Sequence, residues 1–599
     1  KTRQRSLWPW RDRPALRLDF LRSDTLAIAA LYRHHGYIDA RAGVEVMPSR
    51  DAGQVIVTFR VHEGERARIA AIELAGVASY DEADLRRRLW ARPGRPFNPA
   101  YLQLDTLRIS ELYQDRGYRP HVAASYRRDS LQITVRYQVN EGPLYRIGEI
   151  YIASREASVG VNERLIRREL VLRKGDVYRR SRMERSIERL YESGLFSQVQ
   201  VTPLPDSNNT LIEFYVGVRE RKPRWLDAGL GSGTTERFRF TGEWGHRNIL
   251  GHGLQGALNS KLTFYGTGDF QLWRTEASLL EPWLLNSRTR GQVTPFYEQS
   301  NDRADKRWVV RQEASGVNFQ LRRELGRFSR ILLNQSNVFA KQDLEIEDRF
   351  VPDSTRDSVE ATVVSFYSTH RLGLGLERDY RDNPLDPGRG SVQSLSGEIA
   401  GGPFKGKSSF SKVQLVSSWY TPIGTGWVLA TRIRGGTIRP FGDPSRFSPE
   451  VSVDPDVARL PVQDRFRTGG VNSIRGFDEN AIPPSGGLAI VQANLELRIP
   501  LAGPLGVEFY VDAGNVWTRP SYIRWHQFVP AIGREPLDPG DVRYVAGFGP
   551  RVKLPIGPLR VDFTWALRPA EVVEGDGRKR SIGPRYGRPA IQFAVGPSF

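Results

Sequence analysis

The sequence contains no cysteine, and only eight of its 599 residues are histidine. The lack of cysteine excludes disulfide bonds and thiolate metal sites. The histidines form neither H-E-x-x-H nor a similar ligand spacing, which is the usual pattern of a zinc site. We therefore expect neither a metal nor a cofactor.

Long hydrophobic runs are also missing. No stretch approaches 18 consecutive apolar residues, so we expect no membrane-spanning helix. No signal peptide is found at the start. Lys1 is then either the first residue of a mature protein or an internal position of a longer chain.

Sequence patterns of catalysis are absent as well. There is no G-x-S-x-G turn, no Walker loop, and no G-x-G-x-x-G between a strand and a helix. The glycines at 229, 231 and 233 fit a glycine-rich strand better than a phosphate-binding loop. We therefore expect that the protein is not an enzyme.

The net charge of +19 raises the question of nucleic-acid binding. Asp and Glu alternate with the basic residues throughout, however, and no long basic block is present. We therefore expect no nucleic-acid partner. Attraction to anionic lipid head groups is the better explanation, and ordinary solvated surface charge is the simplest one.

Residues 1–222 mix helix and strand patterns and contain a repeat of 78 residues. The repeat ends at Glu63-Gly64, at Glu141-Gly142 and at Arg219-Glu220. This period is too long for common solenoids and suits small separate domains. We predict three α+β domains, at 1–64, 65–143 and 144–222. The first is incomplete, because no opening strand is recognisable in residues 1–16.

Each predicted unit contains a helix that ends in a glycine turn. The helices are 27–35, 102–116 and 183–193, and the glycines are Gly36, Gly117 and Gly194. Glycine in this position suits the left-handed conformation that ends a helix. Two strands follow each glycine, joined in the third unit by a turn at 206–209. The second and third units open with a strand and a second helix, at 82–90 and 162–170.

Residues 223–599 consist almost entirely of predicted strands. The clearest, 488–499, has one apolar face and one largely polar face. Sixteen strands are predicted, at 224–233, 235–245, 253–265, 268–281, 287–300, 306–320, 328–343, 358–381, 389–403, 407–421, 427–439, 488–499, 505–517, 543–553, 558–568 and 589–599. An even strand number is the rule for bacterial antiparallel barrels.

The connections between these strands alternate in length. Short turns rich in Gly and Pro follow the even strands, whereas the long connections 344–357, 440–487, 518–542 and 569–588 follow odd strands. Short periplasmic turns and long external loops are typical of outer-membrane barrels, whereas a soluble sandwich gives no reason for this asymmetry. We predict that 223–599 is a 16-stranded antiparallel transmembrane β-barrel in the outer membrane, with the repeats in the periplasm.

The longest loop, 440–487, contains Arg475 in a glycine-rich segment. A loop of this length is usually functional or disordered. If the loop folds into the barrel lumen, Arg475 becomes a buried cation that needs carboxylate partners. Glu496 and Asp512 on the following strands are the candidates, with Glu508 third. The alternative is an arginine exposed to solvent.

At this point the sequence resembles a known family. Ile474-Arg475-Gly476-Phe477 is similar to the [V/I]-R-G-[F/Y] signature of the BamA/TamA family of outer-membrane protein assembly factors. Residues 509–517 resemble the family's F-x-D-x-G-x-V-W strand, and 247–251 and 378–390 resemble two further motifs. The 78-residue units resemble its POTRA domains. Three units suit a TamA-like protein, whereas a longer parent chain suits a BamA-like one.

The resemblance implies that Arg475 binds Glu496 and Asp512 inside the barrel. It also implies a weak seam between the first and last strands, which carry Gly229, Gly231, Gly233, Phe593 and Phe599. Glycine weakens strands, and an open edge accepts an incoming strand. The implied partners are unfolded outer-membrane β-barrel proteins and membrane lipids, with accessory lipoproteins or a TamB-like inner-membrane protein in addition.

Two other functions are compatible with a barrel that follows repeats or stands alone. A two-partner-secretion translocator pore would carry two repeats and a plug helix, whereas the sequence here has a partial first unit ahead of two complete ones. A passive porin or receptor has no need of the repeats. An assay of how fast an unfolded barrel client folds would distinguish the assembly factor from both alternatives.

Overall fold

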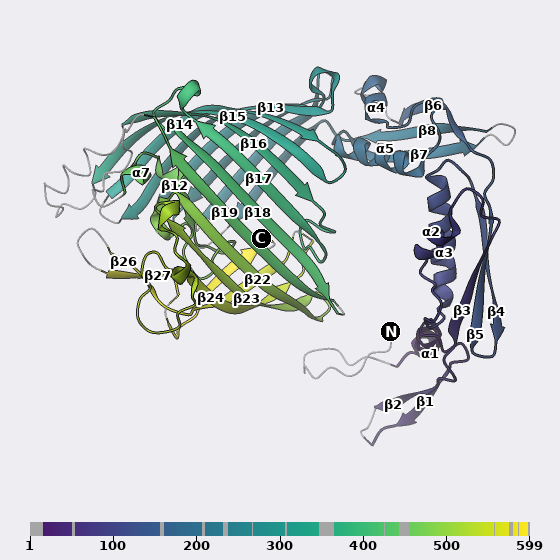
Figure 1. Cartoon of the computed structure of the whole chain (residues 1–599). Coiled ribbons are helices and arrows are strands. Elements are labelled where there is room, and N and C mark those ends of the chain that lie inside the picture. The colour runs from purple at the N-terminus through teal and green to yellow at the C-terminus, as the bar shows by residue number, and fades with distance from the viewer. Residues whose placement is uncertain are drawn as a thin grey trace. The chain divides into compact units, whose positions relative to one another are not determined.

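Two units make up the computed structural model, Lys1–Arg221 and Lys222–Phe599 (Figure 1). The structure describes residues 16–50, 54–155, 161–205, 210–231, 238–265, 268–305, 308–346, 365–424, 426–442, 454–555, 557–573, 579–584 and 586–596. The predicted turn at 206–209 lies outside these residues, as do Gly233 and Phe599.

Two repeats of the first unit share one order of elements: strand, helix, helix, strand, strand, as predicted. One consists of β3 (Arg68–Ala75), α2 (Glu82–Arg87), α3 (Pro99–Gln114), β4 (His121–Asp129) and β5 (Gln132–Asn140). The next consists of β6 (Arg146–Arg155), α4 (Glu163–Glu169), α5 (Arg180–Glu192), β7 (Phe196–Pro205) and β8 (Leu211–Glu220). The closing strand lies in the centre of each sheet, parallel to the opening strand and antiparallel to the other.

Alternation along the central strands builds the two cores. In β5, Ile133, Val135, Tyr137 and Val139 are buried while the intervening residues are more exposed. Residues at every second position of a strand lie on one face, so this face packs against the helices. The residues Ile212, Phe214, Val216 and Val218 do the same in β8.

Ahead of these repeats lie α1 (Leu18–His34) and a two-stranded sheet of β1 (Arg41–Pro48) and β2 (Val55–His62). The helix begins nine residues earlier than predicted, because Arg17 precedes it without a side-chain cap and so gives no sequence signal. Residues 1–15, which make up most of the segment without a recognisable opening strand, lie outside the described residues.

A glycine follows the long helix of every unit and adopts a positive φ: +100° at Gly36, +99° at Gly117 and +73° at Gly194. The prediction of left-handed glycines is confirmed. At Gly117 the space also demands glycine, since a Cβ atom would lie 2.5 Å from Cγ1 of Val177. The Gly117 carbonyl accepts a hydrogen bond from the Tyr145 N–H at 2.8 Å, so this turn also joins one repeat to the next.

Sixteen antiparallel strands form the sheet of the second unit, as predicted (Figure 1). They are β9 (Arg224–Gly231), β10 (Phe238–Ile249), β11 (Leu254–Phe264), β12 (Phe270–Glu281), β13 (Thr289–Asp305), β14 (Trp308–Glu324), β15 (Ser329–Ile346), β16 (Phe366–Asp379), β17 (Gly390–Ala400), β18 (Phe410–Ile423), β19 (Trp427–Pro440), β22 (Ala489–Ala502), β23 (Leu505–Trp517), β24 (Arg543–Val552), β25 (Leu559–Ala566) and β28 (Ala590–Val595). Neighbours in sequence are neighbours in the sheet.

Two small hairpins in the long connections were not predicted. One pairs β20 (Phe466–Thr468) with β21 (Ile482–Gly487), and the other pairs β26 (Ala570–Val573) with β27 (Lys579–Ile582). Their strands are too short for a recognisable alternation.

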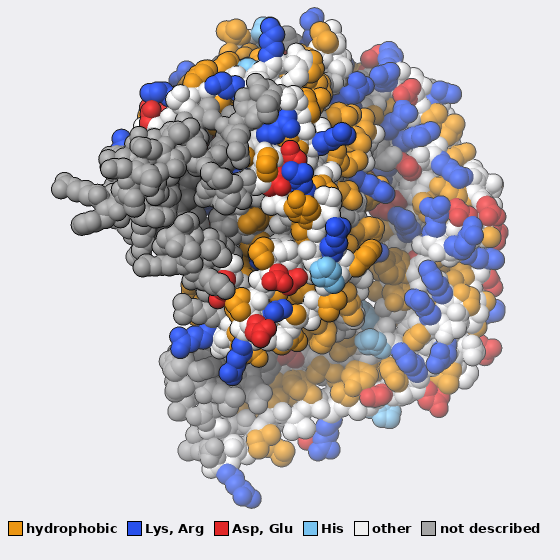
Figure 2. All heavy atoms as spheres, turned by 60° about the vertical axis from the view of Figure 1, so that its left-hand side comes forward, with side chains coloured by type: hydrophobic (Ala, Val, Ile, Leu, Met, Phe, Trp, Pro, Cys, Tyr) orange, Lys and Arg blue, Asp and Glu red, His pale blue; other side chains and the backbone are white. Residues whose placement is uncertain are grey.

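The barrel is polar inside and apolar outside. In β22, Leu495 is 47% exposed, whereas the neighbouring Glu496 is fully buried. Figure 2 shows hydrophobic side chains on the surface of the molecule, alongside Lys and Arg. In the part of the chain that the structure describes, no helix has the length and apolar character needed to cross a membrane. An apolar exterior over a polar interior is the arrangement of a transmembrane β-barrel.

The carboxylate of Glu141, which directly follows β5, predicts how the stability of this repeat depends on pH. It accepts hydrogen bonds from the N–H groups of Ala78 and Ser79 and from the Tyr113 hydroxyl, at 2.6, 2.8 and 2.7 Å. Burial alone would raise the pKa of this carboxyl, but these bonds and the Ser79 hydroxyl outweigh it and lower the pKa to about 2.

A lowered pKa stabilises the fold above the unfolded value, and this stability is lost as pH falls from about 4.5 to about 2. We expect pepsin cleavage within 67–142 to increase over this range in the full chain. Glu141→Gln should cost about 1–2 kcal/mol at neutral pH and remove the pH-dependent step. An identical step in the variant would contradict the assignment.

Candidate functional site

The loop between β19 and β22 enters the barrel interior, and its hairpin β20–β21 encloses the segment that carries the arginine. Gly476 has φ +83°, and a Cβ atom there would lie 2.5 Å from Cγ of Pro584 and 2.9 Å from Cγ2 of Thr564. Only glycine therefore lets the loop backbone approach β25 this closely.

Arg475 is 1% exposed and binds three carboxylates. Its Nε and Nη2 donate to the two Asp512 oxygens at 2.8 and 2.9 Å, a bidentate contact. Its Nη1 donates to Glu496 at 3.1 Å and to Glu508 at 3.2 Å. The guanidinium carbon lies 3.3 Å from the centre of the Tyr510 ring. The structure thus brings together the arginine and all three predicted carboxylates, and the solvent-exposed alternative does not hold.

Strand alternation explains how the carboxylates converge. Glu496 lies on β22, and Glu508 and Asp512 lie on β23, which pairs with β22. Glu496 is opposite Tyr510, and Asn494 is opposite Asp512. All five side chains point into the lumen because they occupy the same phase of the two strands. The Asn494 amide donates to Asp512 at 2.9 Å and to the Ser473 carbonyl at 2.6 Å, which fixes the loop from a second side.

The carboxylates belong to a larger ionic network. It joins four arginines to four carboxylates, each at most 5% exposed: Arg475, Arg498, Arg551 and Arg560 with Glu496, Glu508, Asp512 and Asp562. The formal charges balance. Removing one partner of such a buried set leaves an uncompensated charge inside the barrel. The resulting loss of folding free energy is much larger than the net stabilisation that the ion pair provides.

The turn between β16 and β17 reaches this network, a contact that the sequence did not predict. Asp386 binds Arg551 at 3.0 Å, and the Pro387 carbonyl accepts a hydrogen bond from Arg498 at 3.1 Å. Asp382 shapes the turn by accepting the N–H groups of Gly388 and Arg389. The motif at 378–390 therefore contributes groups to the lumen, although only its turn-forming residues were evident from the sequence.

The two apolar residues of the loop motif pack on the inner wall. Ile474 and Phe477 are buried in a cluster with Val545 of β24 and Ala566 of β25. Glycine at position 583 leaves room for the Phe477 ring, because a Cβ atom on Gly583 would lie 2.4 Å from that ring. Every residue of the Ile-Arg-Gly-Phe motif thus contacts the C-terminal strands of the barrel, β22 to β28.

Within the described residues, the first and last strands are among the shortest of the wall, together with β25, which also has 8 residues. β9 has 8 residues and β28 has 6, whereas β14 has 17. Within the described residues, β9 pairs only with β10, and β28 pairs only with β25. Gly229 and Gly231 lie in β9 opposite Thr241 and Arg239. Phe593 of β28 is 61% exposed and faces outward.

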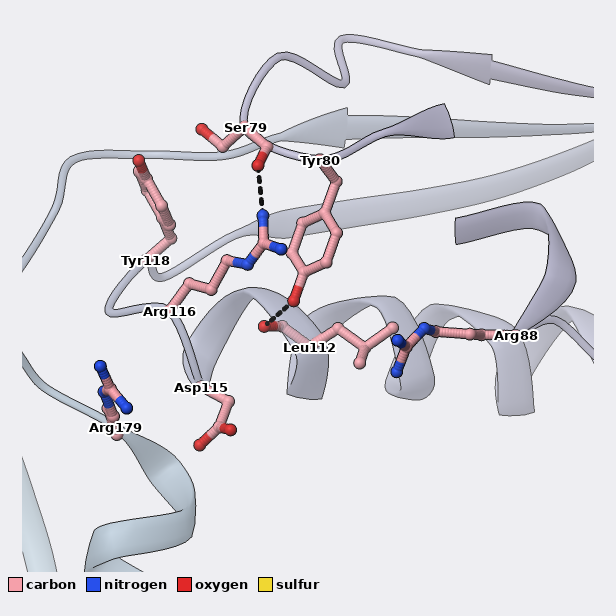
Figure 3. A pocket seen from close by; sticks show the side chains of 8 residues that line it. All are labelled: Ser79, Tyr80, Arg88, Leu112, Asp115, Arg116, Tyr118 and Arg179. Carbon is pink, nitrogen blue, oxygen red and sulfur yellow. Dashed lines mark hydrogen bonds between the residues drawn. The ribbon is translucent and has the colours of Figure 1, made fainter. Parts of the chain in front are cut away.

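A polar pocket lies elsewhere, where the repeats 67–142 and 145–221 meet. It is lined by Ser79, Tyr80, Arg88, Leu112, Asp115, Arg116, Tyr118 and Arg179 (Figure 3). Arg116 stacks on Tyr80 at 3.5 Å, and Tyr80 donates to the Leu112 carbonyl at 2.8 Å (Figure 3). Asp115 accepts the Ser181 N–H at 3.1 Å. Of these contacts, the one between Asp115 and Ser181 joins the two repeats, and the other two lie within the repeat 67–142.

Arg475→Lys tests the anchoring role of the guanidinium. Lysine keeps the charge but loses the planar fork that Asp512 binds, so we expect a cost of about 2 kcal/mol to loop attachment. Protease cleavage within 454–487 should become faster by about thirtyfold, with the strands still resistant. The matched control is Arg534→Lys, which changes an exposed arginine in another loop. Equal cleavage of the two variants would rule out the anchor.

Comparison with known proteins places this geometry in a family. The sequence model of the Omp85 superfamily domain matches residues 248–599, and that of POTRA, the surface antigen variable number repeat, matches 67–142 and 145–221. Outer membrane protein assembly factor BamA of Nitratidesulfovibrio vulgaris is 24% identical over 561 residues, 89% of this chain. The chain spans 66% of the length of that relative.

BamA of Neisseria meningitidis is 21% identical over an alignment that covers 91% of this chain and 70% of that protein. Among solved structures, BamA from Haemophilus ducreyi lacking POTRA domains 1-3 has the same fold, with a TM-score of 0.56 and 20% identity over 88% of this chain and 99% of that one. Since the superfamily match covers more than half of the chain, this protein is a member of the Omp85 superfamily, with POTRA repeats ahead of an outer-membrane β-barrel.

Proposed function

We propose that this protein is an assembly factor that folds other β-barrel proteins into the outer membrane. The observation that carries the proposal is the contrast within one barrel wall: a loop anchored through Arg475 to β22 and β23, beside the two short end strands β9 and β28. An anchored loop keeps the barrel intact while the two ends separate.

The open edges supply the chemistry of client insertion. An edge strand presents unpaired N–H and C=O groups, which template the pairing of another chain. β9 contains two glycines and lies at one end of the sheet. A client strand that pairs with this edge inserts with its backbone hydrogen bonds already satisfied, which the hydrocarbon core of the bilayer requires.

In this proposal the POTRA repeats lie in the periplasm and receive unfolded barrel proteins. Each repeat has a three-stranded sheet with two edge strands, β3 and β4 or β6 and β7. The strand edges offer backbone hydrogen bonds to an extended client regardless of its side chains. Accessory lipoproteins or a TamB-like inner-membrane protein are further proposed partners. The relatives named outer membrane protein assembly factor support the same function.

A reversible cross-link across the seam tests the proposal. The sequence has no cysteine, so Leu226→Cys in β9 with Phe593→Cys in β28 introduces two thiols with which the reagent can react, both at exposed positions. In proteoliposomes, a reducible bifunctional thiol reagent should abolish acceleration of client folding, and reduction should restore it. Protease protection of a refolding barrel client gives the measurement.

The matched control is Leu395→Cys with Leu415→Cys. These residues face each other on β17 and β18 and are 45% and 49% exposed, so the same reagent bridges strands in the middle of the wall. We expect full activity there. Equal activity with both cross-links would reject the seam, and ion conductance or export of a secreted partner without client folding would favour a translocator pore.

A further inference from the structure

The last strand of the barrel is bound by a side chain to the loop motif. Gln592 of β28 is 7% exposed. Its Oε1 accepts the Gly476 N–H at 2.7 Å, and its Nε2 donates to the Phe477 carbonyl at 2.9 Å. The amide thus makes two hydrogen bonds to two consecutive residues of the loop backbone, 116 and 115 positions away in the sequence.

We propose that Gln592 is a positioning residue that couples the lumen loop to β28, the strand that forms one side of the seam. The proposal rests on the seam proposed above. It goes beyond it by naming the group through which the position of the loop sets the position of β28.

The geometry requires glutamine. Its amide carries both a donor and an acceptor, and the loop presents one of each at adjacent residues. Glutamate has no donor for the Phe477 carbonyl, and leucine has neither group. Gly476 is the complementary requirement, since any Cβ there would collide with Pro584 and Thr564 and push the loop backbone away. The glycine of the motif therefore lets the Gly476 N–H and the Phe477 carbonyl come within hydrogen-bonding distance of the Gln592 amide.

The attachment matters because, among the described residues, β28 forms a strand ladder with one neighbour only. Its six residues form a ladder with β25 from Thr564↔Ala590 to Leu559↔Val595, and its other edge ends the sheet. Two hydrogen bonds from a buried amide are a substantial addition to so short a ladder. The arginine network involves β22, β23, β24 and β25 and does not include Gln592, so the loop stays anchored when the amide is removed.

Hydrogen exchange of the full-length protein in membranes tests this coupling. Gln592→Leu should raise the exchange of residues 590–596 by about tenfold, while 489–499 and the protease resistance of loop 454–487 stay unchanged. Gln592→Glu, which keeps the acceptor alone, should fall between the wild type and the leucine variant. A residue with only a general structural role would instead raise exchange in all neighbouring strands.

Gln492→Leu is the matched control. Gln492 is 1% exposed and accepts the Thr468 hydroxyl of the same loop at 3.1 Å, but it lies on β22. Exchange at 590–596 should not change in this variant. Unchanged exchange there in Gln592→Leu, or a rise spread evenly over the barrel, would overturn the proposal. Because exchange is measured without a client, this outcome is independent of whether the wild type accelerates client folding.

Discussion

The contact between Arg475 and Asp512 is the interaction on which the lumen depends. Two parallel hydrogen bonds at 2.8 and 2.9 Å fix the guanidinium plane, and Tyr510 covers its face. With the arginine fixed, the neighbouring residues are fixed as well: Ile474 and Phe477 enter apolar niches, and Gly476 presents its peptide to β28. Within the described part of the loop, 454–487, a few charged atoms thereby set the position of the Ile-Arg-Gly-Phe motif, while Val457, Leu460 and Phe466 pack separately against the barrel wall.

The four arginines and four carboxylates also explain why the barrel tolerates ionised groups in its interior. Each charge has at least one opposite charge within 3.5 Å, and the outer surface supplies the apolar contact that the bilayer needs. The distribution of polar and apolar side chains is therefore the reverse of that in a soluble protein. Polar packing lies inside, hydrophobic exposure lies outside, and the strand period of two separates them residue by residue.

Sequence patterns predicted these features unevenly, and the reason is physical. The alternation in 488–499 places Glu496 on the polar face, and Asp512 follows from the same rule, because strand geometry is local. The sixteen strands could be predicted for the same reason. Gln592 also lies at a polar position between Ile591 and Phe593, but nothing local indicates its loop partner 116 residues away. Asp386 was missed likewise, since its contact with Arg551 depends on how a turn folds across the lumen. The start of α1 was misplaced because Arg17 gives no capping signal.

The turn at Asp386 has a consequence for permeability. Through Arg551 and Arg498 it continues the ionic network from the β22–β25 wall to the connection between β16 and β17. A solute that entered the lumen along this route would have to separate a guanidinium from its carboxylate and leave a buried charge without compensation. The same side chains that position the loop thus place an electrostatic barrier to solutes along this part of the lumen.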